Sequence, residues 1–150
     1  MSDEASLTAE EWAFWDRWMR AQRLLVREVD RVLQTEFGLS KPEFSILVQL
    51  RSAQGGVMRV VELADSLDWD KSRVAHMLTR MEKRGLVDRA GSSESGRRTG
   101  IALSRAGADL ADSAIRTHGQ TIRRVALDGL KGREKAAIEN WSGRLIEELS

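Results

Sequence analysis

The chain of 150 residues contains no cysteine and no tyrosine, and it has only two histidines, His76 and His118. Without cysteine it cannot form disulfides, sense oxidants through a thiol or bind a metal through thiolates. Two histidines leave few groups for nucleophilic, acid–base or metal-assisted chemistry. We therefore expect that the protein is not an enzyme, and we predict no catalytic residue, no metal site and no cofactor.

Long apolar runs are also missing, and the first residues, MSDEASLTAEE, are acidic and lack the apolar centre of a secretory signal. We therefore expect no membrane segment and a cytoplasmic location. Hydrophobic residues make up 41% of the chain and charged residues 31%. This balance is typical of a globular domain of ordinary size and argues against disorder.

Basic side chains are concentrated in residues 70–105. This segment holds nine basic and four acidic side chains, a net charge of +5, whereas the whole chain carries +1 and the remainder therefore −4. A local basic region on a nearly neutral chain predicts a polyanionic partner at one surface. The alternative is a solvated face of mixed charge.

Helix-capping signals indicate that most of the chain is helical. Thr8 and Glu11 form a capping box at the start of a long helix, which Gly38 ends as a left-handed cap. Ser40 and Glu43 form a second capping box directly afterwards. The first part of the chain is therefore predicted to be two successive helices.

Two short helices and a hairpin are predicted in the basic part of the chain. The helices cover residues 58–67 and 71–84, with Asp70 as the N-cap of the second. Residues 86–90 and 99–103 are predicted to be strands joined by a loop rich in glycine, serine and arginine. Two helices joined by so short a turn form a helix-turn-helix, and the hairpin adds a wing.

The second short helix has the two faces that a DNA-recognition helix needs. Val74, Leu78 and Met81 form an apolar back, and the opposite face is basic. The first turn of such a helix reaches deepest into the major groove, where arginine reads guanine through two hydrogen bonds. Contacts with DNA are predicted for Lys71, Ser72, Arg73, His76, Arg80, Arg97 and Arg98. The alternative is a winged-helix module whose basic face binds an acidic protein without specific DNA binding.

Two segments, WDKSRVAHMLTRMEKRGLVDR and ESGRRTGIALSRAG, together with the order of the surrounding helices, resemble the MarR family of bacterial winged-helix transcription regulators. The resemblance implies a mainly α fold with a small β-wing, in a single unit over residues 1–150. Helices at about 8–37 and 105–149 would form a dimerisation domain, and a winged helix-turn-helix would cover about 40–104.

The resemblance also implies a function. A homodimer of this kind would repress transcription by binding double-stranded DNA at a pseudo-palindromic operator. Lys71, Ser72, Arg73 and His76 would approach the major groove, and Arg97 the minor groove. Many family members release DNA when a small aromatic or phenolic compound binds. The family wing often carries Asp-x-Arg, whereas Ser95 stands in the place of that aspartate here, so either Arg97 or the adjacent Arg98 is expected to make the wing contact.

Aromatic side chains are crowded at the start of the first helix. One interpretation is an aromatic-lined effector pocket completed by the second helix. Its predicted lining is Trp15, Trp18, Met19, Phe44, Leu47, Val48 and Arg51. The alternative is that the tryptophans pack within a dimer interface. His118 lies on the apolar side of a later helix and is expected to be a hydrogen-bonded core histidine.

Overall fold

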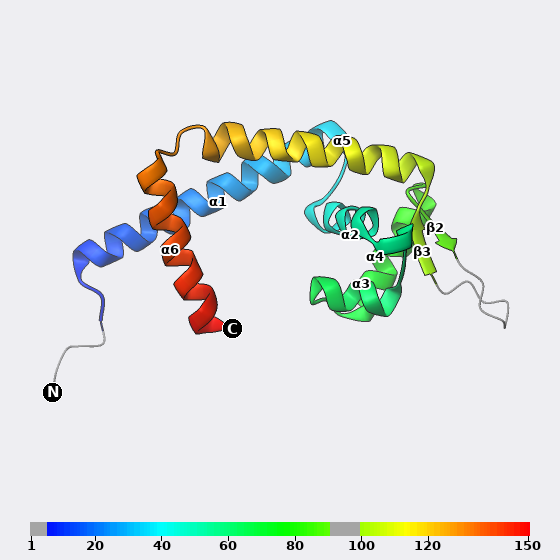
Figure 1. Cartoon of the computed structure of the whole chain (residues 1–150), viewed down its shortest axis with the longest axis horizontal. Helices are drawn as coiled ribbons and strands as arrows, with labels where there is room; N and C mark the ends of the chain where they lie inside the picture. Colours follow the sequence, from blue (N-terminus) through cyan, green and yellow to red (C-terminus); the bar gives the residue numbers. More distant parts are fainter. Residues whose placement is uncertain (1–5, 91–99) are drawn as a thin grey trace. The chain divides into compact units, whose positions relative to one another are not determined.

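A computed structural model describes residues 6–90 and 100–150 of the chain (Figure 1). Its α-helices are α1 (Ala9–Phe37), α2 (Lys41–Ser52), α3 (Val60–Leu67), α4 (Lys71–Lys83), α5 (Arg105–Ile122) and α6 (Gly132–Leu149). Its strands are β1 (Val57–Arg59), β2 (Val87–Ala90) and β3 (Gly100–Leu103). A 3-10 turn, Gln54–Gly56, precedes β1, and a π-helical turn, Arg123–Leu127, follows α5. The prediction of a mainly α fold with a small sheet is confirmed.

The chain forms two compact units, and α1 and α5 each contribute a segment to both. The first unit comprises the residues up to Leu25 together with Gly119–Ser150, and the second comprises Val26–His118. The second unit contains α2, α3, α4 and the sheet, which is the order of elements in a winged helix-turn-helix. No helix in the described ranges is both long enough and apolar enough to cross a membrane.

The three strands form an antiparallel sheet in the order β1–β3–β2. Val87 pairs with Leu103 at one end of the β2–β3 ladder, and Met58 of β1 pairs with Ile101. The prediction that the helix begins at Met58 is wrong, because Val57–Arg59 is a strand and α3 begins at Val60. A strand of three residues depends on hydrogen bonds to a partner far along the chain, so local periodicity does not reveal it.

The core of the second unit draws buried side chains from α1, α2, α3, α4, β2, β3 and α5. Its fully buried side chains include Leu33, Leu39, Ile46, Leu47, Leu50, Leu63, Val74, Leu78, Met81 and Ile101. In Figure 1, α5 lies beside α2, and the ion pair between Arg51 and Asp112 joins these two helices. The core therefore holds α3 and α4 in place against the other elements of the second unit.

The base of the hairpin is closed by hydrogen bonds. After α4, Gly85 takes a left-handed conformation with φ 73°, and the Leu86 N–H donates back to the Met81 carbonyl at 3.0 Å. The Ser104 hydroxyl donates to the Gly85 carbonyl at 2.6 Å and accepts from the Gly107 N–H at 2.9 Å. One serine therefore joins the end of α4 to the start of α5.

The predicted caps at the start of the chain are also present. The Glu11 N–H donates to the Thr8 hydroxyl at 3.2 Å, and the Thr8 N–H donates to the Glu11 carboxylate at 2.7 Å. Ser40 and Glu43 form the same pair of bonds at α2. Gly38, between α1 and α2, has φ 63°, as expected of a left-handed cap.

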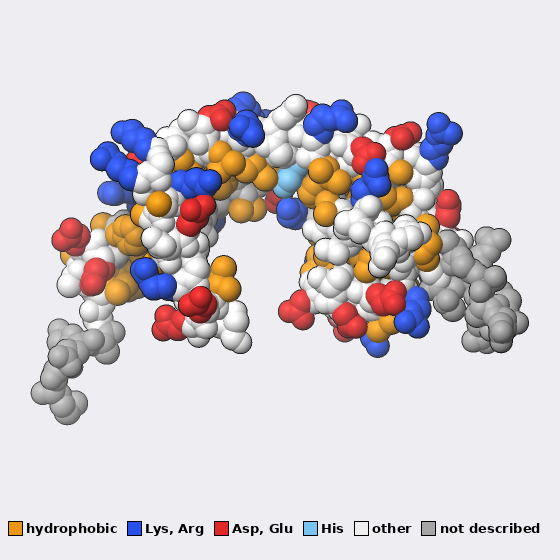
Figure 2. All heavy atoms as spheres, viewed as in Figure 1, with side chains coloured by type: hydrophobic (Ala, Val, Ile, Leu, Met, Phe, Trp, Pro, Cys, Tyr) orange, Lys and Arg blue, Asp and Glu red, His pale blue; other side chains and the backbone are white. Residues whose placement is uncertain are grey.

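The first unit exposes much of its apolar surface (Figure 2). Trp18 and Trp141 meet edge to face, with ring centroids 5.6 Å apart, and join α1 to α6. In contrast, Phe14 is 60% exposed, Ile146 65% and Leu149 80%. In this unit the Trp18–Trp141 pair therefore joins α1 to α6, while large apolar side chains are left in contact with solvent.

Candidate nucleic-acid interface

The start of α4 is fixed by the turn that precedes it. Asp68 caps α3 in a left-handed conformation, with φ 53°. Asp70 is the N-cap of α4, as predicted, and its carboxylate accepts from the Ser72 N–H at 2.7 Å and from the Ser72 hydroxyl. These bonds lower the pKa of Asp70, whose negative charge lies beside the positive end of the helix.

The predicted back and front of α4 are both present. Val74, Leu78 and Met81 are fully buried in the core of the second unit. The predicted DNA-contacting side chains on the opposite face, namely Lys71, Ser72, Arg73, His76 and Arg80, are all exposed. An apolar back that anchors the helix therefore leaves a row of hydrogen-bond donors facing outward over nearly three turns.

Two of these side chains already have partners within the chain. The Ser72 hydroxyl donates to Asp70 and so contributes to the cap. The Arg73 guanidinium lies over the Trp69 ring, with its central carbon 4.3 Å from the ring centroid. This contact is not predicted from the sequence, although a tryptophan four residues before an arginine is a signal from which it can be found.

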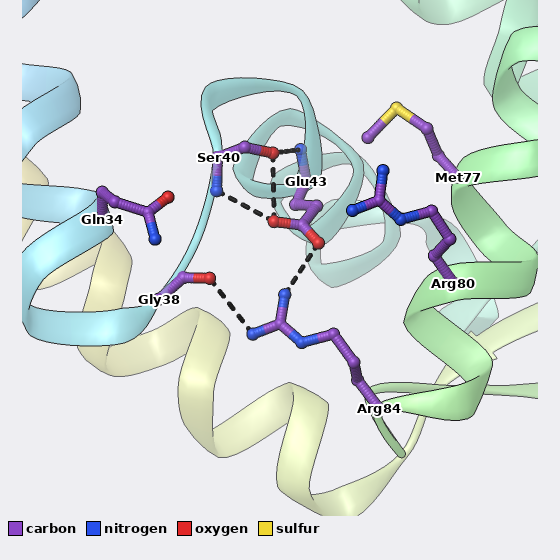
Figure 3. Close-up of a pocket in the computed structure, with 7 residues that line it drawn as sticks. All are labelled: Gln34, Gly38, Ser40, Glu43, Met77, Arg80 and Arg84. Atoms are coloured by element: carbon purple, nitrogen blue, oxygen red, sulfur yellow. Dashed lines mark hydrogen bonds and ion pairs between the residues drawn. The ribbon is translucent and has the colours of Figure 1, made fainter.

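The far end of α4 is tied to the junction between α1 and α2 (Figure 3). The Arg84 guanidinium donates to the Glu43 carboxylate at 2.7 Å and to the Gly38 carbonyl at 3.1 Å. The other oxygen of Glu43 accepts from the Ser40 N–H at 2.9 Å and from the Ser40 hydroxyl at 3.0 Å. Burial raises the pKa of Glu43, but the hydrogen bonds from Ser40 and Arg84 outweigh it, so the pKa is lowered overall.

A hollow of about 270 Å³ lies beside this junction. Its lining is Gln34, Gly38, Ser40, Glu43, Met77, Arg80 and Arg84. Figure 3 shows the Arg80 side chain reaching toward this hollow, next to Glu43. Arg80 is therefore set back from the leading end of the helix, where Lys71 and Arg73 lie.

A second basic surface follows at the foot of the wing. Arg89 of β2 forms an ion pair with Glu82 of α4, with nitrogen and oxygen 3.3 Å apart. These two side chains line a shallow hollow together with Thr79 and Lys83. The residues predicted at the tip of the wing, Arg97 and Arg98, lie outside the described residues, as does Ser95.

The residues predicted to bind an effector belong to both units. Trp15, Trp18 and Met19 line an open, mainly apolar hollow of about 480 Å³ in the first unit, together with Trp141 and Leu145. The others lie in the second unit. Phe44 and Leu47 are 4% and 0% exposed and belong to its core, and Val48 is half-buried. Arg51 is bonded to Asp112 at 2.6 Å and 3.2 Å.

His118 differs from its prediction. Its ring packs on Phe44, with centroids 4.7 Å apart, but Nδ1 is buried and has no hydrogen-bond partner among the described residues. The prediction of a hydrogen-bonded core histidine is therefore wrong for this nitrogen, because the Phe44 ring packs against the imidazole and offers neither a hydrogen-bond donor nor an acceptor. Burial lowers the pKa of His118, and the charge of Lys41 lowers it further.

Comparisons with known proteins give a consistent result. The sequence model of the MarR family matches residues 39–99. The crystal structure of AbsC, a MarR family transcriptional regulator from Streptomyces coelicolor, is 31% identical, with a TM-score of 0.79, and the match covers 96% of this chain and 97% of that one. A comparison with curated proteins found no match.

Two further solved structures are similar. A second MarR family regulator from Streptomyces coelicolor, solved in complex with DNA, is 27% identical over 97% of this chain and 91% of its own, with a TM-score of 0.79. The apo form of MarR from E. coli is 22% identical over 84% of this chain and 94% of its own, with a TM-score of 0.64. Because MarR from E. coli is only 22% identical, its similarity to this chain concerns the fold alone.

Proposed function

Since this chain belongs to the MarR family of transcriptional regulators, we propose that it acts as a homodimeric repressor that binds a pseudo-palindromic operator in double-stranded DNA. The observation that carries the proposal is the leading end of α4. There Asp70 caps the helix, Val74 anchors it, and Lys71 and Arg73 are exposed at its first turn. The DNA complex of the regulator that is 27% identical supports this assignment.

We assign the base-reading role to the first turn of α4. Arg73 and Lys71 are placed to donate to guanine in the major groove, and Ser72 and His76 to hydrogen-bond nearby bases or phosphates. Arg80 lies further back and is assigned to phosphate. Arg97 and Arg98 are assigned to the wing contact on the basis of the sequence alone.

Dimerisation is assigned to the first unit, in accordance with its uncovered apolar side chains on α1 and α6. A two-fold axis relating two copies of α4 predicts half-sites about one helical turn (~10 bp) apart. Trp15, Trp18 and Met19 belong to the same surface, so their hollow is proposed either as part of the dimer core or as the place where a small aromatic or phenolic effector binds.

The proposal is tested by selecting duplexes from a randomised library with the purified protein and measuring affinity for the selected operator and for random DNA. Arg73→Ala is expected to weaken operator binding by roughly 1–3 kcal/mol and to relax the preference at one base pair in each half-site. Arg27→Ala is the matched control, because it removes an exposed arginine of α1 that lies far along the chain from α4. It should change neither the affinity for the operator nor the base preference.

If the protein selects no duplex above random DNA, the repressor proposal fails and binding of an acidic protein becomes the better explanation of the basic face. Equal weakening of operator and random DNA by Arg73→Ala would remove the base-reading role of Arg73. Repeating the binding measurement with 2-hydroxybenzoate tests the effector assignment, which predicts release of the operator.

A further inference from the structure

Trp69 is fixed in position more firmly than a residue in an ordinary turn. It stands between Asp68, which caps α3, and Asp70, which caps α4. Its N–H donates to the Ala64 carbonyl at 2.9 Å, and its half-buried indole packs against the core of the second unit. The ring is therefore a rigid surface at the leading end of α4.

The Arg73 side chain lies against that ring. Its guanidinium carbon lies 4.3 Å from the Trp69 ring centroid, and the side chain is otherwise exposed. The nearest carboxylate along the chain, that of Asp70, accepts through one oxygen from the Ser72 N–H and hydroxyl and from the Arg73 backbone N–H at 3.4 Å. Across the part of the chain that the structure describes, Arg73 forms no ion pair.

A cation held by an aromatic face differs from one held by a carboxylate. The attraction comes from the ring's π electrons and occupies none of the guanidinium N–H groups. An ion pair would use those donors and would have to break before arginine could bind guanine. Arg73 is therefore restrained while its donors remain available.

We propose that Trp69 is a positioning residue for sequence recognition, whose indole holds the Arg73 guanidinium at the leading end of α4 before DNA arrives. The side-chain entropy of Arg73 is then lost in the free protein and not on binding. This inference rests on the proposed function, because it assumes that Arg73 reads a base. It adds that Trp69, which reads no base itself, sets part of the discrimination between operator and random DNA.

The test is a double-mutant cycle between Trp69 and Arg73. Trp69→Leu keeps an apolar side chain against the core and removes the aromatic face. Trp69→Phe keeps a smaller aromatic face and serves as the conservative variant. Both are made in the wild-type chain and in Arg73→Ala, and affinity is measured for the operator that the wild-type protein selects and for random DNA over a series of salt concentrations.

We expect Trp69→Leu to weaken operator binding roughly two- to fivefold, the factor that corresponds to an exposed cation–π contact. Trp69→Phe should weaken operator binding by a smaller factor. Affinity for random DNA and the salt dependence should not change, because no phosphate contact is removed. In the Arg73→Ala background, Trp69→Leu should have no further effect on operator binding.

Several results would overturn the inference. If Trp69→Leu weakens operator and random DNA alike, or keeps its effect in the Arg73→Ala background, Trp69 supports the turn and does not position Arg73. If Trp69→Leu strengthens operator binding, the ring holds Arg73 back. If the wild-type protein selects an operator but the cycle shows no coupling, the inference alone fails and the repressor proposal stands.

An independent measurement keeps the inference testable where a variant folds poorly. In the free wild-type protein, the ring current of Trp69 should shift the NMR resonance of the Arg73 Nε–H relative to the other exposed arginines. Trp69→Phe should reduce that shift and Trp69→Leu should abolish it. A wild-type resonance at the position of the other arginines would show that the contact is not maintained in solution and would overturn the inference.

Discussion

Glu43 joins three segments of the chain through a single carboxylate. One oxygen bonds to Ser40 at the start of α2 and the other to Arg84 at the end of α4, which also bonds to Gly38 after α1. The side chain of Glu43 is 10% exposed and that of Arg84 40%, so water screens this ion pair less than the pairs at the surface. The orientation of α4 therefore depends on the ionisation of Glu43.

Glu43→Gln is expected to lower the free energy of unfolding at pH 7 by roughly 1–3 kcal/mol, since it removes charge-assisted bonds to a largely buried group. The pKa of Glu43 is lowered from 4.5 in the folded protein. Its contribution is therefore complete above the unfolded-state pKa and is lost as the pH falls through the lower folded-state pKa. The difference between wild type and variant at pH 7 should thus shrink in acid, at a pH below the ordinary glutamate value, as measured by urea unfolding followed by circular dichroism.

Other carboxylates with lowered pKa values, including Asp70 and Asp112, also lose stabilising interactions when acid protonates them. The comparison with Glu43→Gln at each pH cancels their contribution. Glu36→Gln, at an exposed position of α1, is the matched control and should unfold as the wild type does at both pH values. A difference for Glu43→Gln that stays constant with pH would contradict the role of its charge.

For individual residues, the sequence predicts the contacts between neighbours that are close along the chain. The capping boxes of Thr8 with Glu11 and of Ser40 with Glu43, and the cap at Asp70, follow from spacing and are all present. The bond from Glu43 to Arg84 is not predicted, because it joins residues 41 positions apart and depends on how α2 and α4 pack.

The start of α5 lies directly against the end of α4. A Cβ atom added to Gly107 would lie 1.9 Å from the Leu86 carbonyl oxygen, which itself accepts from the Ser104 N–H at 3.0 Å. Gly107→Ala should therefore destabilise the protein by roughly 1–3 kcal/mol, because the backbone has to move apart. Thermal unfolding followed by circular dichroism measures this effect.

Gly119, in the same helix, provides the matched control. A Cβ atom there meets nothing within 4 Å, so Gly119→Ala is expected to stabilise α5 by up to about 1 kcal/mol through helix propensity. Opposite changes in melting temperature are thus expected for one substitution at two positions of one helix. If both variants melt at a lower temperature, the close approach at Gly107 is not the cause.

Elements with local sequence signals are predicted better than the short strand β1. Amphipathic spacing and caps locate α4 almost to the residue, and alternation and turn signals locate β2 and β3 within one residue, whereas Met58 and Arg59 of β1 are predicted to be helical. Helix signals lie within one segment, but β1 exists only through its pairing with β3. The candidate DNA-binding face follows from the α4 pattern, while its contact with Trp69 depends on the geometry of the turn.

At the scale of the whole molecule, the first unit leaves large apolar side chains of α1 and α6 uncovered. Trp12 is 50% exposed and Phe14 60% on α1, and Ile146 is 65% exposed on α6. Monomeric proteins rarely leave so many large apolar side chains in contact with solvent within one small unit. The stability of the proposed dimer therefore depends on covering them.

Ile146→Asp should shift the protein from dimer to monomer at micromolar concentration, as measured by sedimentation equilibrium. The stability of a single folded chain should change little, because Ile146 is largely exposed. Burying an unpaired carboxylate in an interface, however, costs about 3 kcal/mol or more. Val57→Asp, the same kind of change at an exposed position of the second unit, is the control and should remain dimeric. An Ile146→Asp protein that sediments as a dimer would place the interface elsewhere.

The hydrogen bonds of Ser104 have a consequence for how this protein can diversify. Because they tie Gly85 and Gly107 together at the foot of the hairpin, the chain leaves the helical core and returns to it at two points a fixed distance apart. A connection between fixed ends tolerates changes of length cheaply, since each doubling costs only about 0.6 kcal/mol of closure entropy. Changes of length in the connection between β2 and β3 are thus expected to leave α4 in its position.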